Sequence, residues 1–70
     1  SVKFKSGKPL EDKQVMAAIA DGQAMLGAGG RLVVRASGTE PVIRVMGEAD
    51  DAGLVSTVVE QIEAAIRDIA

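Results

Sequence analysis

The sequence contains no cysteine and no histidine. It therefore offers no disulfide framework, no thiolate or imidazole ligand for a metal ion, and no imidazole base at neutral pH. Most of the side-chain sets that nucleophilic and metal-dependent enzymes use are excluded on this ground. The lack of cysteine also fits a reducing compartment, so we expect a cytoplasmic location.

Aromatic residues, long apolar runs and an excess of positive charge are also missing. Phe4 is the single aromatic residue, and no apolar run approaches the roughly 18 residues that span a membrane. The formal net charge is −2 and the pI is near 4.9, whereas nucleic-acid surfaces collect positive charge. We expect a soluble chain that binds neither membranes nor nucleic acid, with any anion site confined to one place.

What remains is the composition of a small aliphatic globular domain. Hydrophobic residues make up 47% of the sequence, which argues against disorder. The length of 70 residues allows a single domain, residues 1–70. A domain of this size buries only about 60% of the surface of its unfolded chain, which is compatible with support from a larger parent protein.

The first part of the chain predicts a short strand and a helix. Residues 2–5 alternate apolar and charged side chains, as in a strand with one buried face, and Ser6-Gly7 supplies a turn. A helix is expected to start near Pro9 and to end at Gly27. Gly22 lies on its inward face, where a missing side chain permits a close approach. That inward stripe is expected to contain Val15, Ala18, Ile19, Gly22, Met25 and Leu26.

The second part predicts two adjacent strands and a second helix. Residues 31–36 alternate so that Arg31 and Arg35 share one face. Residues 42–46 resume the alternation after a five-residue connection, which favours an antiparallel pair. Asp50-Asp51 offers a helix cap. The apolar stripe of that helix runs through Val55, Val58, Val59, Ile62, Ala65, Ile66 and Ile69.

This order of elements predicts the fold class. Strand, helix, strand, strand and helix give an α+β fold, with a small antiparallel sheet of three or four strands and two helices packed on one face. The spacing of Met16, Met25 and Met46 indicates core side chains.

Positive charge is concentrated around the connection between the two predicted strands. Arg35 and Arg44 flank Ser37-Gly38-Thr39, so two guanidinium groups, two hydroxyls and the amides around the glycine could converge. Guanidinium forks match phosphate oxygens, and a glycine lets the main chain come close. The same residues also suit an ordinary turn between solvated strand ends. Residue chemistry alone leaves these two interpretations open.

A family resemblance favours the phosphate site. The twelve residues from Arg35 to Met46, RASGTEPVIRVM, resemble the phosphate-binding loop of the α-D-phosphohexomutase superfamily, and within it the phosphoglucosamine mutase branch is the best match. The similarity extends more loosely to residues 5–10, KSGKPL, and to both helices. Essentially the whole chain therefore resembles the fourth, C-terminal domain of these enzymes.

The resemblance implies a role in a larger enzyme. Members interconvert 6-phospho and 1-phospho sugars, with a phosphoserine and a Mg²⁺ ion held by aspartates in other domains. The parent would convert glucosamine 6-phosphate to glucosamine 1-phosphate, towards UDP-N-acetylglucosamine and the cell wall, while this chain alone would be inactive and hold no metal. The residues that match the role of binding the non-reacting phosphate are Arg35, Ser37, Gly38, Thr39 and Arg44, with Glu40 in support, orienting an arginine or meeting the sugar.

Two alternatives stay open. The parent could be a phosphomannomutase or phosphoglucomutase, because the residues that read the sugar ring belong to other parts of such enzymes. From another class, the chain could be a freestanding interaction module that binds a protein through its sheet edge or a helix face.

Overall fold

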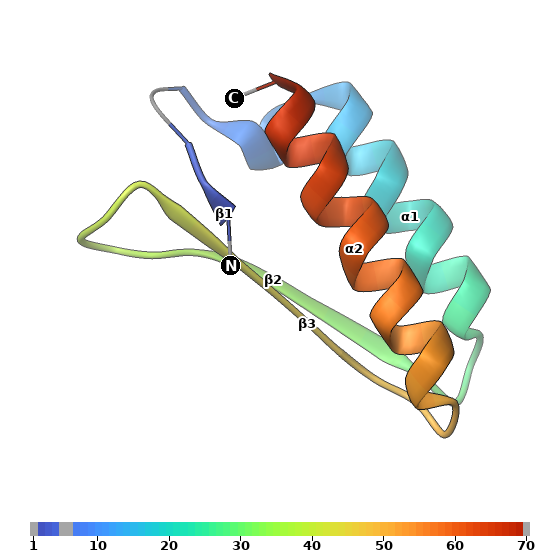
Figure 1. Ribbon diagram of the computed structural model, residues 1–70. Coiled ribbons are helices and arrows are strands. Elements are labelled where there is room, and N and C mark those ends of the chain that lie inside the picture. Colours follow the sequence, from blue (N-terminus) through green and yellow to red (C-terminus); the bar gives the residue numbers. More distant parts are fainter. Residues whose placement is uncertain (1, 5–6, 70) are drawn as a thin grey trace.

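Three antiparallel strands form one sheet, and two helices cover one of its faces (Figure 1). The structure is a computed structural model that describes residues 2–4 and 7–69. The α+β class, the antiparallel sheet and the one-sided helices are confirmed. The elements are β1 Val2–Lys3, the 3-10 turn η1 Pro9–Glu11, α1 Lys13–Leu26, β2 Arg31–Ala36, β3 Val42–Glu48 and α2 Ala52–Ile69, with strand order β1-β3-β2.

Helix α1 begins later than the sequence pattern suggests. Pro9 starts the short η1 turn, and α1 begins only at Lys13, because Asp12 interrupts the helical path with an extended backbone (φ −71°, ψ 137°). The Asp12 carboxylate accepts hydrogen bonds from the amides of Gln14 at 2.8 Å and Val15 at 3.4 Å, as a helix N-cap does. The predicted strand and turn before η1 include Lys5 and Ser6, which lie outside the described residues.

The core lies between the helices and the sheet. Gly22 of α1 faces α2 so closely that a Cβ atom built there would lie 2.7 Å from Cγ1 of Val58. The packing role predicted for this glycine is therefore confirmed, and the predicted stripe of α2 also packs inward. The fully buried large side chains are Val15, Ile43, Val58, Ile62 and Ile66.

The prediction that the methionines belong to the core is wrong. Met16 is 54% exposed, Met25 44% and Met46 52%. The domain has two layers, so branched aliphatic side chains from the helices and one sheet face fill its single core, and side chains on the outer surfaces stay in water. Met46 lies on β3 between Arg44 and Glu48 in the alternation, on the sheet face that no helix covers.

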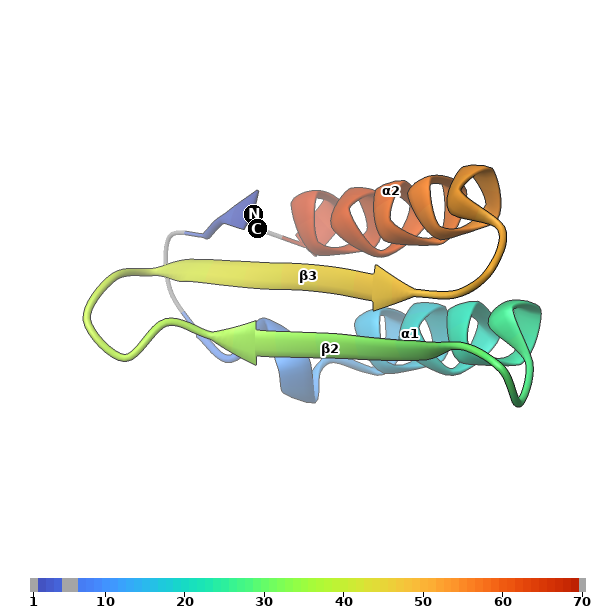
Figure 2. The same cartoon turned by 90° about the horizontal axis from the view of Figure 1, so that it is seen from below.

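The register of β2 and β3 defines this uncovered surface, which we call the outer face. The other residues of β2 alternate with those of the outer face and point towards the helices, namely Leu32, Val34 and Ala36. Figure 2 views the sheet with the helices behind it. Along the outer face the directly opposed residues form three rungs, Arg31 with Glu48, Val33 with Met46, and Arg35 with Arg44.

Of the helices in the described part of the chain, none is long and apolar enough to cross a membrane.

Candidate functional site

Two arginines face each other at the loop end of the hairpin. Arg35 of β2 lies directly opposite Arg44 of β3, so both side chains leave the sheet on its outer face. Like charges in such a pair are destabilising. Neither guanidinium has an ion-pair or hydrogen-bond partner among residues 2–4 and 7–69. The pair therefore presents positive charge that no neighbouring carboxylate in the described part of the chain neutralises.

The opposite end of the same face shows the contrast. There Nε of Arg31 lies 3.1 Å from a carboxylate oxygen of Glu48, and a second nitrogen of the same side chain donates to the other oxygen at 3.3 Å. The two rungs have the same strand geometry but different charges. Of these two rungs, only Arg35 and Arg44 lack a counter-charge within the described residues, so only this rung would gain from binding an external anion.

The connection between β2 and β3 is a loop fixed at both ends. The amide of Ser37 donates to the carbonyl of Val42 at 2.8 Å, and the amide of Val42 donates to the carbonyl of Glu40 at 2.8 Å, which makes a three-residue turn at Pro41. The carbonyl of Pro41 accepts a hydrogen bond from the backbone amide of Phe4 at 2.9 Å. The loop is thus tied to the residue that follows β1 as well as to its own strands.

The middle of the loop carries unpaired donors. The amides of Gly38, Thr39 and Glu40 have no acceptor within the described residues, and the hydroxyls of Ser37 and Thr39 have no partner there either. Successive free backbone amides in a bend are suited to holding an anion. The loop closes one end of the β2–β3 hairpin (Figure 2), and Arg35 and Arg44 lie opposite each other at that same end.

A hollow of about 390 Å³ is lined both by the two arginines and by part of the loop. Of the residues that the sequence singles out, Arg35, Ser37, Gly38 and Arg44 line it. Thr39 and Glu40 are exposed in the same loop but are not part of its lining. The geometry thus brings four of the six together, while phosphate binding itself stays a prediction.

Two further residues line this hollow, Ala36 and Met46, and neither is among the site residues predicted from the sequence. For Met46 a signal existed, since Arg44, Met46 and Glu48 alternate along one strand and must share a face. Ala36 belongs by alternation to the inner face and reaches the hollow only because β2 ends there.

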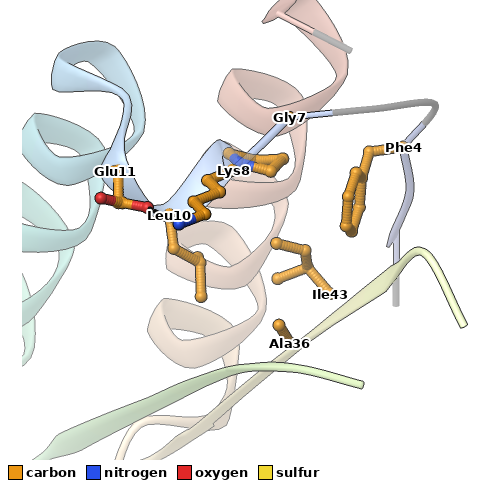
Figure 3. A pocket seen from close by; sticks show the side chains of 8 residues that line it. Phe4, Gly7, Lys8, Leu10, Glu11, Ala36 and Ile43 are labelled. Atoms are coloured by element: carbon orange, nitrogen blue, oxygen red, sulfur yellow. Dashed lines mark ion pairs between the residues drawn. The ribbon is translucent and has the colours of Figure 1, made fainter. Parts of the chain in front are cut away.

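A second hollow, of about 240 Å³, lies on the inner side of the sheet and is a poor anion site (Figure 3). Phe4 stands on one side of it, Leu10 on the other, and Ile43 and Ala36 reach it from the strands. Lys8, the one cation among the described residues that line it, lies 3.7 Å from a carboxylate oxygen of Glu11. An apolar lining cannot replace the water lost by a phosphate.

The carboxylates of the described residues are dispersed. Within residues 2–4 and 7–69, no group of three or more carboxylates lies close enough together to hold an ion.

The chain matches known proteins over nearly its whole length. Residues 1–65 match the family described as phosphoglucomutase/phosphomannomutase, C-terminal domain. The chain is 64% identical to a phosphoglucosamine mutase of Sphingopyxis alaskensis over 67 residues, or 96% of the chain. It is 58% identical to a phosphoglucosamine mutase of Parvibaculum lavamentivorans over 66 residues, or 94% of the chain. It is 54% identical over all 70 residues to a phosphoglucosamine mutase of Azorhizobium caulinodans. It spans only 15% to 16% of the length of these relatives. No solved structure matches the chain.

Proposed function

Because this chain belongs to the phosphoglucomutase/phosphomannomutase family, as its C-terminal domain, we propose that it binds the non-reacting phosphate of a phosphosugar. One observation carries the proposal. Arg35 and Arg44 form a like-charged rung without a counter-charge in the described residues, beside a hollow of about 390 Å³. Such a rung is destabilising when empty and favourable when an anion lies between its members.

Each group has a distinct task in this proposal. The two guanidinium groups supply paired donors whose spacing matches the oxygens of a phosphate. Ser37 adds a hydroxyl and the Gly38 segment adds free amides from the loop side. Thr39 supplies a second hydroxyl once the loop closes on the ligand, and Glu40, which cannot donate, orients an arginine or contacts the sugar.

The parent reaction that we propose is that of a phosphoglucosamine mutase. The relatives at 54% to 64% identity carry that name, and it implies conversion of glucosamine 6-phosphate to glucosamine 1-phosphate, towards UDP-N-acetylglucosamine and the cell wall. The family description also covers glucose and mannose phosphates, so a phosphomannomutase or phosphoglucomutase is the alternative parent. The proposed location is the cytoplasm.

The contribution of this domain to catalysis is positioning. A firm hold on the remote phosphate fixes the sugar, so that binding energy gained away from the reacting centre lowers the barrier there. The reaction that the family resemblance implies passes through a sugar bisphosphate that must turn around between two transfers. A clamp that reads only a phosphate group accepts either end of that intermediate, and a domain that swings open permits the turn.

The isolated chain should be inactive. The phosphoserine and the Mg²⁺ ion expected for the family lie, in this proposal, in other domains of the parent. Mg²⁺ would there help the phosphoryl transfer, and none of the present residues takes part in that step. The chain alone should bind phosphate weakly, because a few charge-assisted hydrogen bonds of about 1.5 to 3 kcal/mol each must also offset the entropy of association.

The direct test is the variant Arg35→Gln in the full-length parent enzyme. We expect kcat/KM to fall by on the order of 100-fold, which corresponds to one or two charge-assisted hydrogen bonds lost in the transition state. Circular dichroism should show an unchanged fold, because the side chain is exposed. The control Arg67→Gln removes an exposed cation from the last turn of α2, away from the hollow, and should leave kcat/KM unchanged. Equal activity of the two variants would refute the proposal.

A further inference from the structure

Lys3 extends the positive charge of the outer face onto a third strand. β1 pairs with β3 so that Lys3 lies directly opposite Val42, which is two residues along the chain from Arg44. Val2, the other residue of β1, is buried, so the alternation turns the exposed Lys3 to the outer face. We propose that Lys3 is a third cation of the phosphate site, which attracts the anion by its charge from the neighbouring strand. This inference rests on the proposed function.

The strand geometry lets Lys3 act on the same anion as Arg44. Diagonal neighbours on adjacent antiparallel strands lie roughly 7 to 8 Å apart, which is within reach of long side chains. Lys3 and Arg44 form such a diagonal pair. Lys3 is not among the residues that line the hollow of about 390 Å³. Its proposed effect is therefore Coulombic attraction over a short distance, without a fixed hydrogen bond.

The loop itself holds Lys3 in this place. The backbone amide of Phe4, the next residue along the chain, donates to the carbonyl of Pro41 at 2.9 Å. Pro41 belongs to the connection between β2 and β3 that carries the unpaired donors around Gly38. Figure 2 shows β1 alongside β3, on the side away from β2. The hydrogen bond that ties the loop thus also keeps Lys3 beside it.

No carboxylate among residues 2–4 and 7–69 pairs with this group of cations. The ammonium of Lys3 has no ion-pair partner there, and the loop carboxylate of Glu40 makes no ion pair there with Lys3 or with either arginine. Arg31 and Glu48 neutralise each other at the far end of the outer face. Positive charge is therefore localised at the loop end, although the chain as a whole has a net charge of −2. Such a local field raises the concentration of an anion near the site.

A lysine on an edge strand has another use, which is to discourage pairing of exposed strand edges between molecules. β1 is an edge strand in the order β1-β3-β2, so this use also accounts for an exposed Lys3. It does not account for a cation placed beside two unpaired arginines, where like charges repel. A bound anion would offset that repulsion. The two explanations differ in the affinity of the chain for phosphate, which only the proposed role makes dependent on Lys3.

The test is an NMR titration of the 70-residue chain and its variants with inorganic phosphate, followed through the amides of residues 35–44. Lys3→Gln should raise the Kd about threefold to fivefold at low salt, the loss expected for one charge at this distance from a doubly charged phosphate. The factor should shrink at an ionic strength of about 0.1 M, where the Debye length is about 10 Å. Lys3→Arg keeps the charge and should keep the affinity.

Lys8→Gln is the matched control. Lys8 lies at the hollow on the inner side of the sheet and already pairs with Glu11 at 3.7 Å. Its loss changes the net charge of the chain by the same amount and should leave the Kd unchanged. Equal losses of affinity in Lys3→Gln and Lys8→Gln would reveal only an effect of net charge and would overturn the inference.

A third variant separates this inference from the proposed function. An unchanged Kd in Lys3→Gln, together with lost binding in Arg35→Gln, would overturn the role of Lys3 alone. No response of the unsubstituted chain to phosphate would overturn the proposed phosphate site, and the role of Lys3 with it.

Discussion

Arg35 and Arg44 lie directly opposite each other across β2 and β3 on the uncovered face of the sheet. At the other end of that face Arg31 pairs with Glu48 at 3.1 Å. One pair of strands thus carries an attractive rung and a repulsive rung under the same backbone geometry. The two positive charges that repel each other in the empty hairpin are also the charges that would attract a phosphate.

A stability measurement can detect this repulsion. The variant Arg44→Gln should raise the free energy of unfolding of the unliganded chain by about 0.2 to 1 kcal/mol, because it removes a like-charged cross-strand pair. Urea denaturation at low salt is the appropriate measurement, since salt screens exposed charges. The matched variant Arg31→Gln breaks an opposite-charge pair and should lower stability by up to about 1 kcal/mol. Changes of the same sign in both variants would contradict the account.

The affinity for a phosphomonoester should depend on pH through the ligand. Its second ionisation has a pKa near 6, and two guanidinium groups favour the dianion over the monoanion. Glucosamine 6-phosphate should therefore bind about tenfold more weakly at pH 5 than at pH 7, because only about a tenth of it is then doubly charged. The sequence contains no histidine that could titrate in this range.

Sulfate is the control for that experiment, because it remains doubly charged between pH 5 and pH 7. Its affinity should stay flat if the ligand alone titrates. A parallel loss of sulfate and phosphate binding at pH 5 would contradict the claim that the ligand alone titrates.

Gly22 should not tolerate a methyl group. A Cβ atom there would lie 2.7 Å from Cγ1 of Val58 and 3.3 Å from Cδ1 of Leu32. Gly22→Ala gains about 1 kcal/mol of helix propensity but loses about 1 to 3 kcal/mol to overpacking, so we expect net destabilisation in thermal or urea unfolding. Gly29→Ala is the control, because nothing lies within 4 Å of its Cβ position. A more stable Gly22→Ala variant would show that the helices separate at little cost.

The sequence predicts the fold well because two strong periodicities coincide. The stripe from Val55 to Ile69 and the alternation of residues 31–36 specify a helix and a strand with little ambiguity. The alternation also predicts that Arg31 and Arg35 share a face. The length of the connection after β2 then places Arg35 opposite Arg44, since a shift by one residue would turn one arginine inward.

Other features depend on contacts that no periodicity encodes. The amides of Gly38 to Glu40 lie in a loop that ends in a tight turn at Pro41, where the Val42 amide donates to the Glu40 carbonyl. The side chain of Gln23 accepts a hydrogen bond from the amide of Leu32 at 3.1 Å, which holds the edge strand β2 to α1. The exposure of Met46 differs from these features, because its alternation with Arg44 and Glu48 along β3 does indicate the outer face, although its hydrophobicity favours the core.

The most direct test of the central claim is an NMR titration of the chain with inorganic phosphate, followed through its backbone amides. The account predicts saturable shifts confined to residues 35–44, with weak affinity, and their loss in the variant Arg35→Ala while the rest of the spectrum is unchanged. Shifts spread evenly over the surface, or a response that survives the loss of Arg35, would contradict the claim that this hairpin end is a phosphate site.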